Sequence, residues 1–278
     1  MLRVWVRALP FLCLLALGAC SPSSAPSSPY ANNLAISDAQ GKPRDTTTFY
    51  FPAADSMPAP KAPRPEGVVL DGREENCAME LKMASHYLTY FEAPVLSNFY
   101  LGTPIYRLLW LRSFHRPVLL TLRRTATGAT LRTQVLDKHP FFIELSARNP
   151  DELPADASPS ERAAVKENYE RLMADSAFQA QVAAGKRRAV QVRSAETTHS
   201  ISLAQYQAFE RLLAQAQFRQ LPSCSPSWAN DGARWTLEAH QAGAYHMVSR
   251  QNPDKKSGFR KACEYLIERS SVRAEERY

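Results

Sequence analysis

The stretch Tyr106–Leu122, YRLLWLRSFHRPVLLTL, decides the fold of this 278-residue chain. Tyr106–Phe114 is rich in Leu and contains Trp110, and Pro117–Arg123 is rich in Leu and contains Val118, so each predicts a strand buried in a sheet. The connection between them is too short for a crossover, which makes the two strands an antiparallel pair. The centre of the protein is therefore expected to be an antiparallel sheet.

Further strands and helices are expected on both sides of this pair. A turn at Thr125–Gly128 leads into a strand over Thr130–Leu136, and Gly243 joins strands over Arg234–His240 and Ala244–Arg250. Apolar residues three to four apart predict helices, and Ser158-Pro159-Ser160-Glu161 has the form of a capping box. The predicted helices are Glu74–Phe91, Ser158–Ala184 stopped by Gly185, Leu203–Gln217 capped by Ser202, and Ser257–Ser270, with a strand at Lys186–Val192. This order predicts an α+β fold in a single body over residues 67–278.

The chain begins with a short apolar run that ends at a cysteine. Arg3 and Arg7 precede the run Ala8–Leu17, which is too short to cross a bilayer and predicts a signal peptide over residues 1–19. The sequence Leu17-Gly18-Ala19-Cys20 resembles the lipobox of bacterial lipoproteins. The resemblance implies cleavage before Cys20, acylation of that residue and anchoring in a membrane. Because Ser21 is not the Asp that retains lipoproteins in the inner membrane, we expect the periplasmic side of the outer membrane.

Residues 20–66 are expected to form a disordered tether. The segment Ser21–Pro65 holds nine of the protein's 20 prolines, together with many Ser and Ala residues. Such a composition favours extended, solvated chain and cannot bury a core. Within it, a small patch such as Thr48–Phe51 could dock back on the body as an edge strand.

Composition excludes several classes of protein. A hydrophobic fraction of 45% and a charged fraction of 22% fit neither a wholly disordered chain nor a multi-span membrane protein. The net charge of +7 comes from basic residues in separate segments without a nucleic-acid-binding motif. We therefore expect a solvated basic surface near anionic lipid or envelope polymers, and no nucleic-acid partner.

Motifs for catalysis and cofactor binding are missing. Gly67–Gly72 has the spacing of a phosphate loop but lacks the following Lys-Ser/Thr, and no G-x-S-x-G, H-E-x-x-H, G-x-G-x-x-G or C-x-x-C occurs. The six histidines have no metal-ligand spacing on a helix. No cofactor and no metal is expected.

Three cysteines belong to the body, namely Cys77, Cys224 and Cys263. Export would place them in an oxidising compartment, where one disulfide and one leftover thiol are expected. Cys224 lies just before the last hairpin and Cys263 in the helix after it, so these two are the preferred pair. The competing interpretation makes Cys77 and Cys263 small core residues on helix faces.

The hairpin around Gly243 holds the candidate site. A three-residue loop, Gln241–Gly243, would place Trp235 and Leu237 on an apolar face and Glu238 directly across from His246 on a polar one. With Arg250 on the polar face, and Asp231 or His115 nearby, these side chains could bind a ligand or centre an enzyme. The alternative is a solvated face with cross-strand charge pairs.

Tyr106–Leu122 and Asp231–Pro253, followed by a helix containing Ala262-Cys263, also resemble a recurring bacterial protein group without a characterised activity. That resemblance implies an architecture and no function.

The leading hypothesis is a non-enzymatic, lipid-anchored envelope module that binds an envelope component or a small ligand. The alternative is an envelope or periplasmic enzyme using Glu238, His246 and Arg250. A structural assembly factor, which would expose an apolar patch, is a third possibility.

Overall fold

The structure is a computed structural model that describes residues 29–52, 77–140, 150, 153, 158–189, 192–225 and 231–278. The signal peptide, Cys20, the segment Gly67–Gly72 and the start of the predicted helix at Glu74 lie outside these residues. The elements are α1 (Cys77–Tyr90), β1 (Ile105–Arg112), β2 (His115–Arg124), β3 (Gly128–Leu136), α2 (Pro159–Ala174), α3 (Ser176–Ala189), β4 (Ser194–Ser202), α4 (Leu203–Gln215), the 3-10 helix η3 (Phe218–Gln220), β5 (Ala233–Gln241), β6 (Ala244–Gln251) and α5 (Gly258–Glu268).

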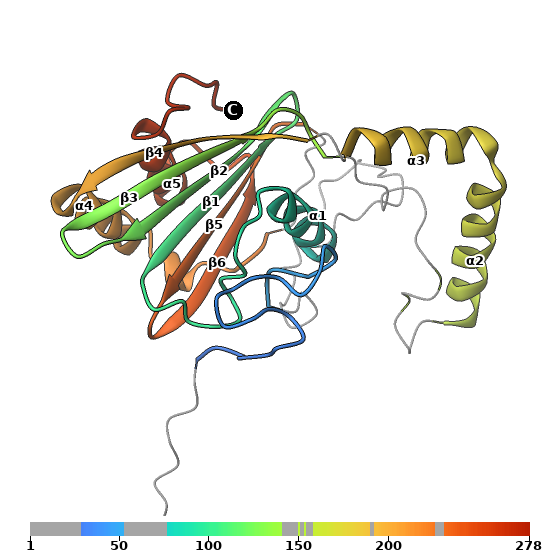
Figure 1. The fold of residues 1–278 in the computed structure, drawn as a ribbon, viewed down its shortest axis with the longest axis horizontal. Coiled ribbons are helices and arrows are strands. Elements are labelled where there is room, and N and C mark those ends of the chain that lie inside the picture. Colours follow the sequence, from blue (N-terminus) through green and yellow to red (C-terminus); the bar gives the residue numbers. More distant parts are fainter. Residues whose placement is uncertain are drawn as a thin grey trace, which may run out of the picture.

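The strands form one antiparallel sheet of six strands in the order β4-β3-β2-β1-β5-β6 (Figure 1). The predicted α+β class is therefore confirmed. The predicted central hairpin is present as β1 and β2, and every residue of β1 is buried, because both faces of the sheet are covered. A strand that is buried on both sides has a nearly continuous apolar sequence. This explains why the sequence Tyr106–Leu122 is so apolar.

One face of the sheet packs against α4 and α5. Trp110 and Trp235 lie at its centre with ring centroids 5.3 Å apart, and Phe209 from α4 and Leu266 from α5 are fully buried against the same core. Ser202 begins α4 with the predicted cap, since its Oγ accepts from the backbone N–H of Gln205. These amphipathic helices form as expected because each has a face to bury.

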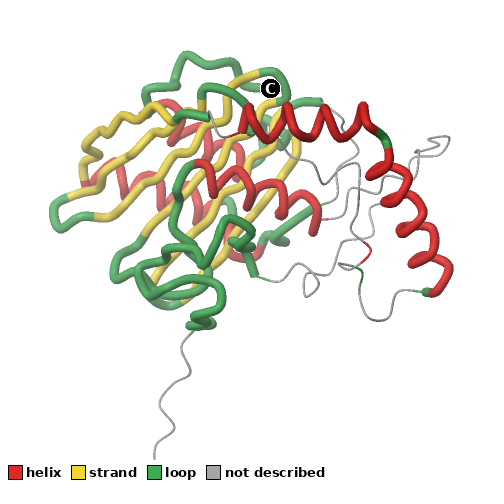
Figure 2. The backbone as a smooth tube through the Cα atoms, turned by 45° about the vertical axis from the view of Figure 1, so that its right-hand side comes forward, coloured by secondary structure: helices red, strands yellow, loops and turns green. Residues whose placement is uncertain are grey.

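The opposite face is covered by α1 and by the N-terminal segment of residues 29–52, so the sheet lies between two layers (Figures 1 and 2). Tyr50 is fully buried; its backbone N–H donates to Ser85 Oγ and its carbonyl accepts from Ser97 Oγ. The expectation of a disordered tether is thus wrong for residues 29–52. Aromatic side chains at Tyr30, Tyr50 and Phe51 bury enough apolar surface to hold this segment against the body, and the segment contains only one serine, Ser37.

The helix predicted over Ser158–Ala184 is two helices. It begins at Pro159 as expected, but Asp175 Oδ1 accepts from the N–H groups of Ala177 and Phe178 and so starts α3 anew. The helix also continues past Gly185 to Ala189, which makes the strand predicted at Lys186–Val192 wrong. A helical glycine costs only about 1 kcal/mol relative to alanine, which neighbouring helix-forming residues offset. Figure 1 shows α2 and α3 extending away from the sheet.

Among the described helices, none combines the length and the apolar character that crossing a membrane requires.

Candidate functional site

The register of the β5–β6 hairpin differs from the prediction. The loop has two residues, Ala242 and Gly243, so Gln241 pairs with Ala244 and Ala239 pairs with His246. Glu238 pairs with Met247, and Glu238 and His246 therefore point to opposite faces of the sheet. The alternation of apolar and polar residues predicted the wrong register. It assumes one solvated face, whereas both faces of this hairpin are buried.

Glu238 belongs to a buried ion pair beneath α1 and the N-terminal segment. Its carboxylate accepts from Arg107 Nε at 2.5 Å and Nη2 at 2.8 Å, and from the Tyr245 hydroxyl at 2.9 Å. Arg107 also donates to the carbonyl of Pro94. Both charged side chains are only 1% exposed. A charge pair this enclosed and this well hydrogen-bonded joins strands β1 and β5 and is not accessible to a ligand.

His246 and Arg250 lie on the other face, on the side of α4 and α5. The His246 ring packs edge-on against Phe218 with centroids 5.1 Å apart, and burial lowers its pKa. Arg250 Nη2 donates to the carbonyl of Pro222 at 2.7 Å. Both side chains are engaged in packing around the loop that precedes β5.

His115 and Asp231 lie near the β1–β2 turn, at the end of the sheet away from the β5–β6 loop. His115 Nδ1 is 2.9 Å from the Tyr278 hydroxyl, and the Asp231 carbonyl accepts from Asn252 Nδ2 at 3.0 Å. The five predicted residues do not converge, so the predicted hairpin site is wrong. The competing interpretation of a solvated face is also wrong, because Glu238 is fully buried.

The disulfide joins Cys77 to Cys224, with Cα atoms 5.9 Å apart, and Cys263 is a free, buried thiol. The predicted Cys224–Cys263 pair is wrong because Cys263 faces the core between α5 and the sheet. Cys224 instead bridges to Ser249 at the outer edge of β6, within reach of the first residue of α1. The competing interpretation is confirmed for Cys263, which is a small buried core residue, and is wrong for Cys77, which forms the disulfide.

Within the described part of the chain, the one cluster of potential metal ligands is formed by Cys77, Glu80 and Cys224. The two sulfur atoms are bonded to each other, and Glu80 forms an ion pair with Arg234. Oxidised sulfur is a poor ligand and the carboxylate is neutralised, so this cluster does not favour a metal.

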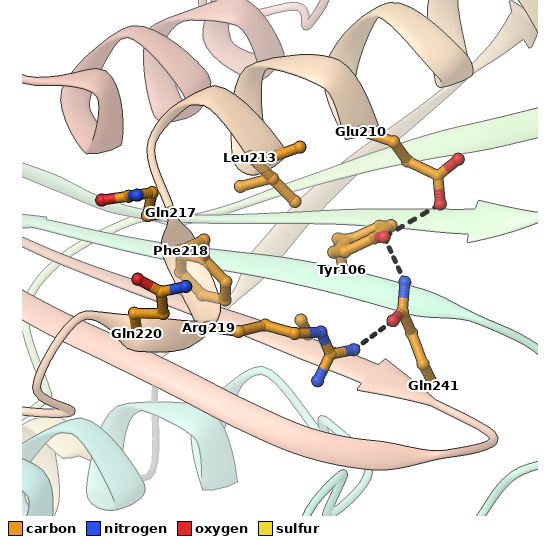
Figure 3. A pocket seen from close by; sticks show the side chains of 10 residues that line it. Tyr106, Glu210, Leu213, Gln217, Phe218, Arg219, Gln220 and Gln241 are labelled. Atoms are coloured by element: carbon orange, nitrogen blue, oxygen red, sulfur yellow. Dashed lines mark hydrogen bonds between the residues drawn. The ribbon is translucent and has the colours of Figure 1, made fainter.

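A cleft of about 480 Å³ lies where α4 and η3 cross the ends of β1 and β5 (Figure 3). Apolar side chains form one part of its lining and hydrogen-bonding side chains the other. The apolar residues are Leu213, Ala214, Phe218 and Ala239, and the polar ones are Tyr106, Glu210, Gln217, Arg219, Gln220 and Gln241.

A chain of hydrogen bonds runs along the cleft from an acid to a base (Figure 3). The Tyr106 hydroxyl donates to Glu210 Oε1 at 3.0 Å and accepts from Gln241 Nε2. The Gln241 carbonyl oxygen accepts from the guanidinium of Arg219. Burial, with the nearby carboxylate of Glu210 as a smaller cause, raises the pKa of Tyr106 well above its usual value. Tyr106 is therefore a neutral hydroxyl between two charged groups.

The backbone after α4 builds one wall of this cleft. Gln217 has φ 49° and ψ 39°, a left-handed conformation that is uncommon for a residue with a side chain. This turn reverses the chain into η3, buries Phe218 and leaves Arg219 and Gln220 exposed at the rim. Uncommon backbone of this kind gathers at binding sites.

Sequence reasoning missed the cleft residues. The sequence pattern places Tyr106 only in a strand, and Glu210 lies beside the apolar stripe of its helix, four residues after Tyr206. The one available signal is the polar pair Arg219-Gln220 a few residues after the helix end, which has no motif of its own.

The cleft presents a carboxylate, a guanidinium, amides and a phenol over an apolar floor. These groups can bind a small polar ligand through several hydrogen bonds. No family model, curated protein or solved structure matches this chain.

Proposed function

We propose that this chain is a lipid-anchored protein of the cell envelope, held in the membrane through Cys20, and that its body binds a small zwitterionic ligand in the α4–η3 cleft. The observation that carries the binding role is the position of Glu210 and Arg219 at the two ends of one hydrogen-bonded chain in that cleft.

Two features support the proposed location in the cell envelope. The lipobox-like sequence at Leu17–Cys20 directs acylation in proteins that share it, and its position after a short apolar run suits export. The Cys77–Cys224 disulfide is compatible with an oxidising compartment such as the periplasm. The periplasmic side of the outer membrane remains the preferred location, since Ser21 follows the cysteine.

The chemistry of the cleft supports the proposed ligand class. Glu210 is half-buried and suits an ammonium group, whereas the exposed Arg219 suits a carboxylate. Leu213 and Phe218 contribute to the apolar part of the lining of the same cleft. Free amino acids and short peptides carry both charges on a compact frame, and we therefore name them as the ligand class.

A binding role is preferred to the enzymatic alternative. That alternative depended on Glu238, His246 and Arg250 acting together, and these side chains lie on two faces of the sheet. No other described group of side chains specifically favours catalysis.

Labelling with a fatty-acid analogue tests the anchor. The unmodified chain, expressed in a bacterium with two membranes, should take up the label and fractionate with the outer membrane. The Cys20→Ser variant should do neither. Label that persists in Cys20→Ser would overturn the anchor without affecting the binding proposal.

Calorimetric titration of the detergent-solubilised full chain with a panel of amino acids and dipeptides tests the cleft. At least one member should bind, and Glu210→Gln or Arg219→Gln should each weaken binding roughly 10- to 150-fold, the expected effect of one charged hydrogen bond. Arg211→Gln is the matched control, because Arg211 is exposed on α4 but does not line the cleft. Absence of binding by the whole panel, or equal effects of all three substitutions, would refute the proposal.

A further inference from the structure

The two edge strands of the sheet, β6 and β4, differ in whether another segment hydrogen-bonds to them. Along β6, the loop before β5 adds a short parallel bridge between Cys224 and Ser249, and the Ser249 N–H donates to the Ser223 carbonyl at 2.7 Å. At the other edge, β4 pairs with β3 alone, and among the described residues no strand follows it. All of β4 except Ile201 is exposed. The strand β4 is therefore the open edge of the sheet (Figure 1).

The hydrogen-bonding groups on the outer side of β4 follow from its register. The Arg193 carbonyl accepts from the Asp137 N–H, so the backbone of residue 193 points towards β3. In an antiparallel pair this direction alternates along the strand. The N–H and C=O groups of five residues therefore point outward, namely Ser194, Glu196, Thr198, Ser200 and Ser202. Of these, the N–H of Ser202 is occupied by Gln205 Oε1.

The edge lacks the devices that normally prevent strand addition. Proteins protect exposed edges with proline, lysine, bulges or a very short strand. The nine-residue strand SAETTHSIS contains neither proline nor lysine, and its pairing with β3 is continuous from Ser194 to Ser202. Its one acid, Glu196, is paired with Arg132 from β3. The edge is long, regular and close to neutral.

We propose that β4 pairs with β4 of a second copy of this chain, in antiparallel orientation about a twofold axis at Thr198. Thr198 then lies opposite Thr198 of the second copy, Glu196 opposite Ser200, and Ser194 opposite Ser202. This register aligns the nine residues of both strands. It matches free outward groups from Glu196 to Ser200, while the N–H and C=O of Ser202 are already used by Gln205 and by α4.

Self-pairing in this register also avoids repulsion between like charges and a clash with α4. A shift that centres the axis on Glu196 would oppose two carboxylates, and a shift that centres it on Ser200 would run into α4, whereas the Thr198 register does neither. The two six-stranded sheets would join into one continuous sheet. A twofold axis perpendicular to that sheet keeps both N-terminal segments on the same face, so two lipid anchors could reach one membrane. That last point depends on the proposed anchor; the pairing itself does not.

Sedimentation equilibrium of the full chain in a density-matched detergent tests the pairing. The chain should be dimeric, and Thr198→Pro should weaken dimerisation roughly tenfold or more, because it removes an outward N–H and places a ring at the interface. The fold should survive, since the Thr198 N–H is not bonded to β3. Thr198→Val keeps the N–H and is the matched control, which should remain dimeric.

Crosslinking gives a second readout that does not depend on affinity. Opposite residues in a hydrogen-bonded antiparallel pair have Cα atoms about 5.5 Å apart, within disulfide range. A Thr198→Cys variant should therefore form a covalent dimer under mild oxidation, whereas Ser194→Cys, placed opposite Ser202, should not. A monomeric wild-type chain, a dimer indifferent to Thr198→Pro, or equal crosslinking of the two cysteine variants would overturn the proposal.

Discussion

Removal of the Cys77–Cys224 disulfide should be among the most destabilising changes in this protein. The bond closes a loop with a sequence separation of 147 residues. In the chain-entropy description, a crosslink over a loop of that length stabilises the folded state by about 5 kcal/mol, because it restricts the unfolded chain. The double variant Cys77→Ala/Cys224→Ala should lose most of that stability without leaving an unpaired thiol.

Urea unfolding followed by circular dichroism measures the loss, with Cys263→Ala as control. Cys263 is fully buried but forms no crosslink, so its substitution should cost only about 1–2 kcal/mol. Peptide mapping without reduction should find Cys77 linked to Cys224, and within the body a single thiol, Cys263, that reacts only after denaturation. A peptide joining Cys224 to Cys263, or a double variant no less stable than Cys263→Ala, would refute the assignment.

Three further outcomes follow from buried groups. Arg107→Leu leaves Glu238 buried without its partner and should lower the free energy of unfolding by about 3–5 kcal/mol. The double variant Arg107→Leu/Glu238→Leu should recover much of that loss. A loss below about 1 kcal/mol for Arg107→Leu in urea unfolding would contradict this. Burial lowers the pKa of His240 below its ordinary value of 6.5, and a backbone N–H donates into its Nε2, so the folded state favours the neutral ring. The unfolded chain then binds more protons below pH 6.5, and the melting temperature should fall from there until the folded-state pKa is passed; a His240→Gln variant should show a shallower fall. Finally, Gly128→Ala would place a methyl group 2.4 Å from a β4 carbonyl and should cost about 1–3 kcal/mol in thermal unfolding, whereas Gly243→Ala, with open space around it, should be nearly neutral.

Local patterns predicted the elements of this fold well. Most elements lie within a few residues of their expected ranges, namely β1, β2, β3, β5, β6, α1, α4 and α5. Each of them can be predicted from its own apolar periodicity and its own cap. The errors fall where a local signal is weak. Gly185 did not stop α3, and Asp175 divided a helix that was expected to be continuous.

The candidate site was predicted poorly for a different reason. Placing Glu238 near His246 required the register of one hairpin, and a slip of one residue moves a side chain to the other face of a sheet. The apolar-face argument assumes that one face is solvated, yet α1 and residues 29–52 cover one side while α4 and α5 cover the other. The cleft at Tyr106 draws on residues more than a hundred positions apart and has no local motif.

The sequence alone determined the α+β class, the positions of most strands and helices, and the expectation of an exported, lipid-anchored chain, since each depends on contiguous residues. Only the tertiary structure decided which cysteines pair, which face each hairpin residue occupies, that residues 29–52 pack on the body, and that β4 is an open edge. The physical reason is that these features depend on contacts between distant segments, and burial on both faces of the sheet removes the polar–apolar contrast from which such contacts could be inferred.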